Sequence, residues 1–193
     1  RPWVDMYVYL DGEYGFANAM GKILMSSSLA EFRKQILVEP IAGCVHLSIN
    51  GERLAIPHFE RPKTLDELPS PYLTGLLDPF FNSPFSPMIS TNRGCPFTCA
   101  FCHDGDSALN KVTKFSFERV QAEIEYIGER VAKTQNSLTI SDLNFGMFKN
   151  DIPICEALAD ARDRTGYPAH IKTTTGKNSK ERVIETVKKL KGA

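Results

Sequence analysis

Apolar residues in the second half of the chain recur with two different spacings. Between residues 116 and 131 they step by three and four, which predicts a helix with one buried face that Ser116 can cap. Three short stretches are instead typical of strands: 88–91, 137–142 and 169–174. Helical spacing follows each of them, starting at Ser116, Asp151 and Ser179. The order βαβαβα predicts a parallel sheet with right-handed crossovers.

The first 56 residues show a different pattern. Residues 4–10 alternate between apolar and polar positions and predict a strand. Residues 14–26 predict a helix, and a hairpin is expected around Asn50-Gly51, with its strands at 45–49 and 53–56. The apolar face of the helix is expected to consist of Phe16, Met20, Ile23 and Leu24.

A proline-rich stretch separates these two patterns. Residues 57–87 hold seven of the twelve prolines, each of which removes a backbone donor and restricts the preceding residue. We therefore expect an extended connector there. The predicted organisation is a first domain over 1–56, a connector over 57–85 and a second domain over 86–193.

The composition narrows the class of protein. The chain has 193 residues with balanced charge, so it does not have the basic surface of a nucleic-acid-binding protein. Neither a run of transmembrane length nor a signal peptide is recognisable, and we expect no membrane partner. Five cysteines, three of them close together, indicate a reducing, cytoplasmic setting rather than a disulfide scaffold. Without an initiator Met, the chain is expected to be a piece of a longer protein.

The clustered cysteines are the strongest chemical signal. Cys95, Cys99 and Cys102 have the spacing CxxxCxxC, which lets one loop wrap one iron–sulfur cluster. A cubane cluster with three cysteine ligands leaves one iron open to chelation by the amino and carboxylate groups of a substrate. Cys44 and Cys155 are expected to be plain buried residues.

A non-enzymatic module with structural zinc is the alternative interpretation. Such a site needs four tetrahedral ligands. His103 is adjacent to Cys102 and poorly placed to share its metal, so the fourth ligand would have to be Cys44 or Cys155. His103 itself is expected to be a loop residue.

The cysteine motif, with Phe101 just before the third cysteine, resembles the radical SAM superfamily. The resemblance implies a 4Fe–4S cluster and S-adenosylmethionine, which is cleaved reductively to a 5′-deoxyadenosyl radical. It also implies that the loop follows the first strand of a partial (β/α)6 TIM-like barrel, at the mouth where barrel active sites lie. Phe101 is expected beside the bound cofactor. A reductant such as flavodoxin or ferredoxin would supply the electron.

Two further strand ends are implicated by the same resemblance. Asp142 and Asn144 stand where the family carries a motif that binds the amino group of S-adenosylmethionine, and both side chains offer acceptors. An Asx turn at the strand end is the alternative for this pair. Thr175 and Lys177 follow the third strand and are expected near the cofactor carboxylate or a substrate anion. A solvated loop lysine is the alternative for Lys177.

The N-terminal part resembles radical SAM proteins that have an upstream cobalamin-binding domain. Residues 65–78 are similar to their connector, and residues 4–27 look like the last βα unit of a Rossmann-like domain. The predicted fold class is thus α/β, the first half of a radical SAM barrel preceded by the end of a cobalamin-binding domain. No DxHxxG stretch is present, so cobalamin is expected only in the complete protein. The substrate is expected to be a small molecule of unknown identity.

Overall fold

A computed structural model describes residues 4–9, 11–55, 62–105, 110–176 and 178–191. The chain divides into two compact units, Arg1–Pro62 and Lys63–Ala193, which are described separately.

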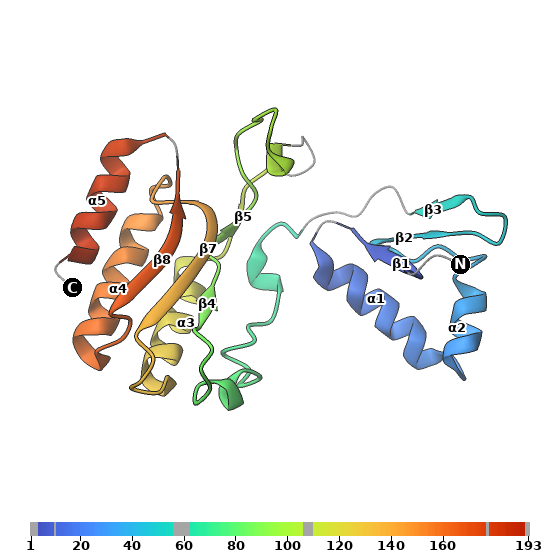
Figure 1. Cartoon of the computed structure of the whole chain (residues 1–193), viewed down its shortest axis with the longest axis horizontal. Helices are drawn as coiled ribbons and strands as arrows, with labels where there is room; N and C mark the ends of the chain where they lie inside the picture. The colour runs from blue at the N-terminus through green and yellow to red at the C-terminus, as the bar shows by residue number, and fades with distance from the viewer. Residues whose placement is uncertain (1–3, 10, 56–61, 106–109, 177, 192–193) are drawn as a thin grey trace. The chain divides into compact units, whose positions relative to one another are not determined.

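The first unit is a small sheet with two helices (Figure 1). The sheet order is β1-β2-β3, and both strand pairs are antiparallel. The expected hairpin is confirmed, with Gly51 in the left-handed conformation that its turn requires. A Rossmann-like unit contains parallel strands, whereas β1 pairs antiparallel with β2. The assignment of residues 4–27 to such a unit therefore stays a prediction. The elements are β1 Met6–Val8, α1 Gly12–Met25, α2 Leu29–Gln35, β2 Cys44–Leu47 and β3 Arg53–Ala55.

Helix α1 buries only part of the face that was expected. Ile23 packs against the core of this unit, but Phe16 and Leu24 are 60% and 80% exposed, and Gly15 and Ala19 are buried instead. The reason is a close approach of the helix to the backbone near β2. A Cβ at Gly15 would lie 2.5 Å from the carbonyl oxygen of Gly43, so only glycine fits there. The largest side chains of the helix therefore do not mark its buried face.

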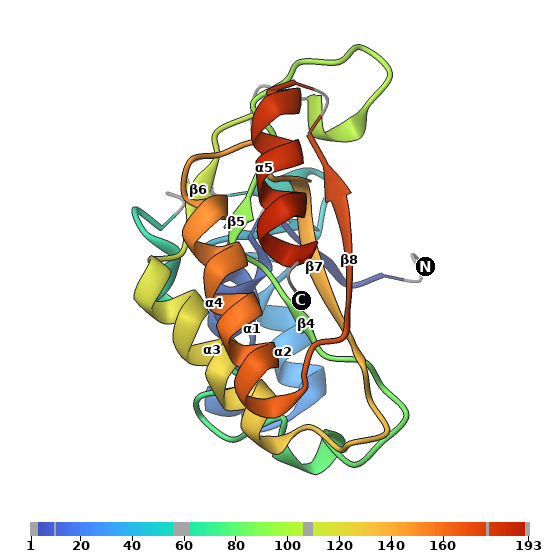
Figure 2. The same ribbon diagram turned by 90° about the vertical axis from the view of Figure 1, so that its left-hand side faces the viewer.

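The second unit contains the predicted parallel sheet. Its order is β4-β7-β8, both pairings are parallel, and a helix follows each strand (Figure 1). The helices cover one face of the sheet, as the view in Figure 2 shows. The elements are β4 Met88–Ile89, α3 Phe117–Arg130, β7 Ser137–Phe145, α4 Asp151–Thr165, β8 His170–Thr175 and α5 Lys180–Lys191.

The core of this unit lies between the sheet and its helices. Helix α3 contributes Val120, Ile124 and Ile127, as the helical spacing predicted, and β7 contributes Leu138 and Ile140. The Ser116 hydroxyl accepts a hydrogen bond from the Arg119 amide at the start of α3, which confirms the predicted cap. Burial of these five side chains contributes roughly 1.5–3 kcal/mol each and fixes the position of β7.

A second, two-stranded sheet interrupts the first βα unit and was not predicted. Strand β5 (Asn92–Arg93) pairs antiparallel with β6 (Thr113–Lys114), and the cysteine loop runs between them. The Phe115 amide also donates to the Thr91 carbonyl at 3.0 Å. The two ends of the cysteine loop are therefore held together. The residues that join them, 91–93 and 113–115, are called the base of the loop.

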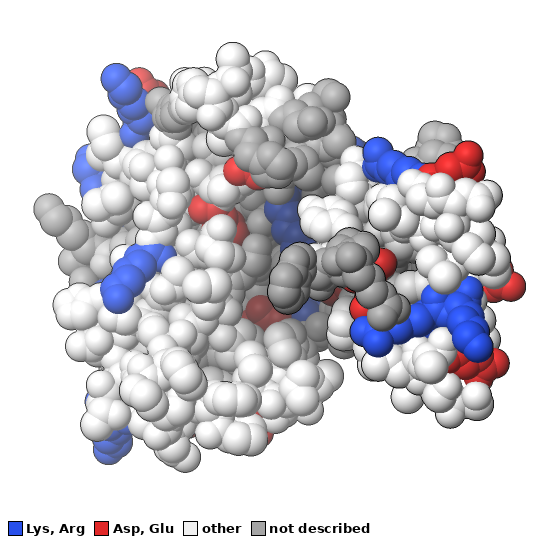
Figure 3. Space-filling model, turned by 45° about the vertical axis from the view of Figure 1, so that its right-hand side comes forward, with Lys and Arg blue, Asp and Glu red and all other residues white. Residues whose placement is uncertain are grey.

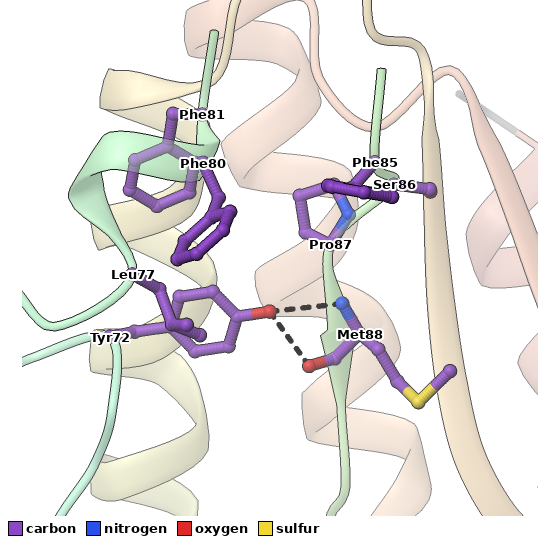
Figure 4. Close-up of a pocket in the computed structure, with 8 residues that line it drawn as sticks. All are labelled: Tyr72, Leu77, Phe80, Phe81, Phe85, Ser86, Pro87 and Met88. Carbon is purple, nitrogen blue, oxygen red and sulfur yellow. Dashed lines mark hydrogen bonds between the residues drawn. The ribbon is translucent and has the colours of Figure 1, made fainter. Parts of the chain in front are cut away.

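The second part of the predicted connector is not a free linker. The boundary between the two units falls after Pro62, and Leu65, Leu68 and Tyr72 are buried in the second unit. The Tyr72 hydroxyl donates to the Met88 carbonyl at 2.8 Å and accepts from the Met88 amide at 3.0 Å (Figure 4). Two short 3-10 helices, η1 Leu65–Glu67 and η2 Asp78–Phe80, lie in this stretch.

Some of the surface charges lie in ion pairs, such as Lys22 with Glu39 and Arg33 with Asp5. On the face in Figure 3, lysines, arginines and acidic residues are dispersed among uncharged side chains rather than gathered into one patch. None of the helices in the described part of the chain is both long and apolar enough to span a membrane.

Candidate iron–sulfur and S-adenosylmethionine site

The three clustered cysteines lie on the loop between β5 and β6, after the first strand of the parallel sheet. Gly94 has a φ of 95° and turns the chain into the loop directly before Cys95. The Cys102 amide donates to the Cys99 carbonyl at 3.0 Å, so these two residues share one tight turn. Gly105 packs against that turn, and a Cβ there would meet the Cys99 oxygen at 2.5 Å. The predicted position of the loop, at the carboxyl end of the first strand, is confirmed.

The five cysteines fall into two groups by burial. Cys95 and Cys99 are half-buried and Cys102 is exposed, and all five are thiols rather than halves of a disulfide. Cys44 and Cys155 are fully buried, as expected. Burial, followed by the charge of Asp151, raises the pKa of Cys155 to about 12, and burial also raises the pKa of Cys44. Because the thiolate is the metal-binding form, only the loop cysteines are suited to hold a metal group.

The cysteine loop supplies three thiols within eight residues. Among the residues that the structure describes, no group of three or more His, Cys, Asp or Glu side chains forms a ready-made site for a single metal ion. In a 4Fe–4S cluster each cysteine binds a different iron, and three thiols on one short loop are a ligand set of that kind. Assignment of Cys95, Cys99 and Cys102 as cluster ligands stays a prediction.

Asp142 lies near the carboxyl end of β7 and supports the base of the cysteine loop. Its side chain is buried, as those of Leu138 and Ile140 are. It accepts hydrogen bonds from the Thr91 amide at 2.8 Å, the Asn92 side-chain amide at 2.7 Å and the Thr91 hydroxyl. An S-adenosylmethionine ammonium would therefore have to share these oxygens. The predicted contact of Asp142 with that ammonium stays a prediction.

Burial raises the pKa of the Asp142 carboxyl, and the hydrogen bonds from Thr91 and Asn92 act in the opposite direction. Asp151, at the start of α4, is also buried, and its carboxylate accepts from the Phe148 amide at 2.8 Å. Burial raises the pKa of Asp151 to about 6, and the charge of Asp142 adds to that shift. Helix α4 begins at Asp151, where the helical spacing was predicted to start.

Asn144 lies two residues further along β7 and reaches the cysteine loop directly. Its side-chain amide donates to the Cys95 sulfur across an N···S distance of 3.2 Å. Asn144 is buried, and its backbone carbonyl accepts a hydrogen bond from the Met147 amide in the turn after β7. The structure thus brings Asn144 and Cys95 together, although they lie 49 residues apart in the sequence.

The other predicted site residues are less engaged. Phe101 is on the cysteine loop and 85% exposed. Thr175 is exposed at the carboxyl end of β8, where it pairs with Phe145 of β7. Lys177 lies outside the described residues. Thr91 and Asn92 were missed by sequence reasoning, although a polar pair just before Gly94-Cys95 is a signal that could have identified them.

An apolar pocket of about 330 Å3 lies elsewhere in the second unit. It is lined by side chains from 72–88, among them Tyr72, Phe81, Phe85 and Met88 (Figure 4). It lies at the amino end of β4, whereas the cysteine loop follows the carboxyl end of that strand. Active sites of parallel barrels lie at the carboxyl ends, so this pocket is not the candidate site.

Comparison with known proteins identifies two relatives that match 97% of the chain. It is 35% identical to 2-(S-pantetheinyl)-carbapenam-3-carboxylate methyltransferase of Streptantibioticus cattleyicolor, and 31% identical to the cobalamin-dependent radical SAM methyltransferase TokK of Streptomyces tokunonensis. The chain spans 27% of the length of each. No protein-family model matches it.

A solved structure supports the fold independently. The cobalamin-dependent S-adenosylmethionine radical enzyme OxsB, with aqua-cobalamin and S-adenosylmethionine bound, superposes on 95% of this chain with a TM-score of 0.55. The two sequences are 18% identical over that match, which covers 25% of the OxsB chain. The mixed α/β fold of this chain is therefore similar to part of that enzyme.

Proposed function

The chain belongs to the cobalamin-dependent radical SAM enzymes, and from this premise we propose that the complete protein is a methyltransferase of that kind. The observation that carries the proposal is the loop with Cys95, Cys99 and Cys102, which offers accessible thiols at the carboxyl end of the parallel sheet. The names of the two curated relatives favour methyl transfer over other radical SAM reactions. A structural zinc module is not favoured.

When bound at these cysteines, a 4Fe–4S cluster and S-adenosylmethionine supply reductive cleavage of the cofactor and a 5′-deoxyadenosyl radical. The three thiolates would hold the cluster and leave one iron open. The oxygen of the Asn144 amide is an acceptor suited to the cofactor ammonium, and Asp142 holds the base of the loop in place for it. Such pre-positioning reduces the reorganisation needed at the reacting bond.

The remaining proposed contacts lie around the same strand ends. Thr175 and Lys177 would bind the cofactor carboxylate, since Thr175 ends the third strand and Lys177 comes two residues later in the sequence. Phe101 would cover the bound cofactor and help to exclude water. The electron would come from a flavodoxin or ferredoxin, and the substrate would be a small molecule. These 193 residues contain no DxHxxG stretch, so we assign no cobalamin contact to them.

The test is reconstitution of the full-length protein with iron and sulfide under anaerobic conditions. Changing Cys95, Cys99 or Cys102 to Ala should abolish the bound iron, the visible absorption and 5′-deoxyadenosine formation. Cys44→Ala and Cys155→Ala are matched controls and should keep all three, because both thiols are fully buried in hydrophobic cores. The proposal would be overturned if the wild type bound one colourless zinc, or if a Cys44 or Cys155 variant lost iron while Cys99→Ala kept it.

A further inference from the structure

We propose that Asn144 sets the reduction potential of the cluster by donating a hydrogen bond to the sulfur of Cys95. This inference rests on the proposed function, since it requires a cluster on that cysteine. It gives the Asn144 amide two roles from its two ends. The nitrogen faces a cluster ligand, and the oxygen remains an acceptor for the cofactor.

The contact is built into the fold rather than into the loop. Asn144 comes from β7, which is held by β4 on one side and β8 on the other. Its neighbour Phe145 is buried and in register with Thr175 of β8, and the turn after the strand is closed by the Met147 amide. The donor is therefore fixed independently of the cysteine loop, and its N···S distance of 3.2 Å is that of a direct hydrogen bond.

The chemistry follows from charge. On reduction the cluster takes up one electron from a low-potential donor, no bond is broken, and the extra negative charge spreads over the sulfurs. An N–H group aimed at a sulfur stabilises that reduced form more than the oxidised form, which raises the potential. Burial of Asn144 strengthens the effect, since water competes little for the donor.

The ligands are not equivalent in this respect. The Cys102 sulfur lies 4.0 Å from a carboxylate oxygen of Asp104, which is an acceptor and not a donor. Cys95 has the amide donor. The Cys95 sulfur thus has a hydrogen-bond donor beside it, whereas the Cys102 sulfur has a carboxylate acceptor. Removal of the Asn144 donor is therefore expected to disfavour reduction of the cluster.

The experiment is a redox titration of the reconstituted full-length protein, without S-adenosylmethionine, using dithionite and mediators and following the reduced cluster by EPR. Asn144→Leu removes the donor at similar volume and should lower the reduction equilibrium constant about tenfold, a shift of about 59 mV to more negative potential. Asn144→Asp replaces the donor with a negative acceptor and should shift it further in the same direction. Ser141→Ala is the control on the same strand. Its hydroxyl donates to the Ile89 carbonyl and not to sulfur, so the potential should stay unchanged.

The outcomes separate this inference from the proposed function. If the wild type assembles no iron–sulfur cluster, the proposed function fails and this inference fails with it. If clusters assemble in every variant but both Asn144 variants keep the wild-type potential, only the tuning role is refuted. A purely structural role would reduce the amount of cluster while leaving the potential of the remainder unmoved, and that result also refutes the inference.

Discussion

Replacement of Asp142 by Ala should release the base of the cysteine loop. The carboxylate accepts from the Thr91 amide, the Thr91 hydroxyl and the Asn92 side-chain amide, and all these groups are buried. A hydrogen bond to a charged group contributes about 1.5–3 kcal/mol, so three of them give a gross loss of roughly 5–9 kcal/mol. Relief of the buried charge, whose cost is visible in the raised pKa of Asp142, offsets part of this. We expect a net local loss of about 3 kcal/mol.

The assay is hydrogen exchange, read at the amides of Thr91 and Asn92 in the metal-free protein. A local loss of about 3 kcal/mol corresponds to exchange that is roughly a hundredfold faster at Thr91, because opening of the loop base limits exchange there. Asp66→Ala is the control. Asp66 is an exposed carboxylate that accepts from the Ser116 amide, 50 residues away, so its removal should affect exchange at Ser116 and not at Thr91. Unchanged exchange at Thr91 in Asp142→Ala, together with weaker S-adenosylmethionine binding, would refute the supporting role and favour direct contact with the cofactor.

Two further predictions concern stability. The pKa of Asp151 is about 6 in the folded chain against 3.8 ordinarily, so the folded state binds this proton more tightly and stability should fall as pH rises from about 4 to 6. The loss in the free energy of unfolding is at most about 3 kcal/mol. In a series of urea unfolding midpoints measured against pH, Asp151→Asn should remove the fall between about pH 4 and 6. An unchanged fall in the variant would contradict the assignment of this pH dependence to Asp151. Tyr72→Phe should cost about 2 kcal/mol in urea unfolding, since it leaves the Met88 amide and carbonyl without the hydroxyl that bonds both. A loss below about 0.5 kcal/mol would show that water replaces it.

The parallel sheet and its helices could be predicted because their signals are local. Val120, Ile124 and Ile127 repeat at helical spacing, and the apolar stretches at 88–91 and 137–142 mark strands that proved parallel. Strands β5 and β6 have no such signal, since each consists of only two polar residues. Helix α2 was missed although Ser28 and Glu31 form the spacing of a capping box, and the Ser28 hydroxyl does accept from the Glu31 amide.

The cysteine motif could be recognised in the sequence, whereas the side chains that support its loop could not. Three cysteines within eight residues are visible in any sequence, but the contacts of Asp142 with Thr91 and of Asn144 with Cys95 join different segments of the chain. Which polar side chain at a strand end faces the loop depends on the alternation along β7, and its register shifts between Ile140 and Phe145. The structure places Asp142 and Asn144 beside the cysteine loop, as expected, but nothing in the sequence indicated that protein donors would occupy the oxygens of Asp142.

The distance along the chain between the cysteine loop and its supports bears on the order in which the protein matures. Asp142 follows Thr91 by 51 residues, and Asn144 follows Cys95 by 49. At a synthesis rate of about 5–20 residues per second, the loop is made roughly 3–10 s before either support exists. A cluster delivered in that interval would meet three cysteines on a chain whose loop base is not yet held. The base of the loop therefore gains its supports only when β7 docks, and a cluster inserted after that step would meet cysteines whose loop is already held.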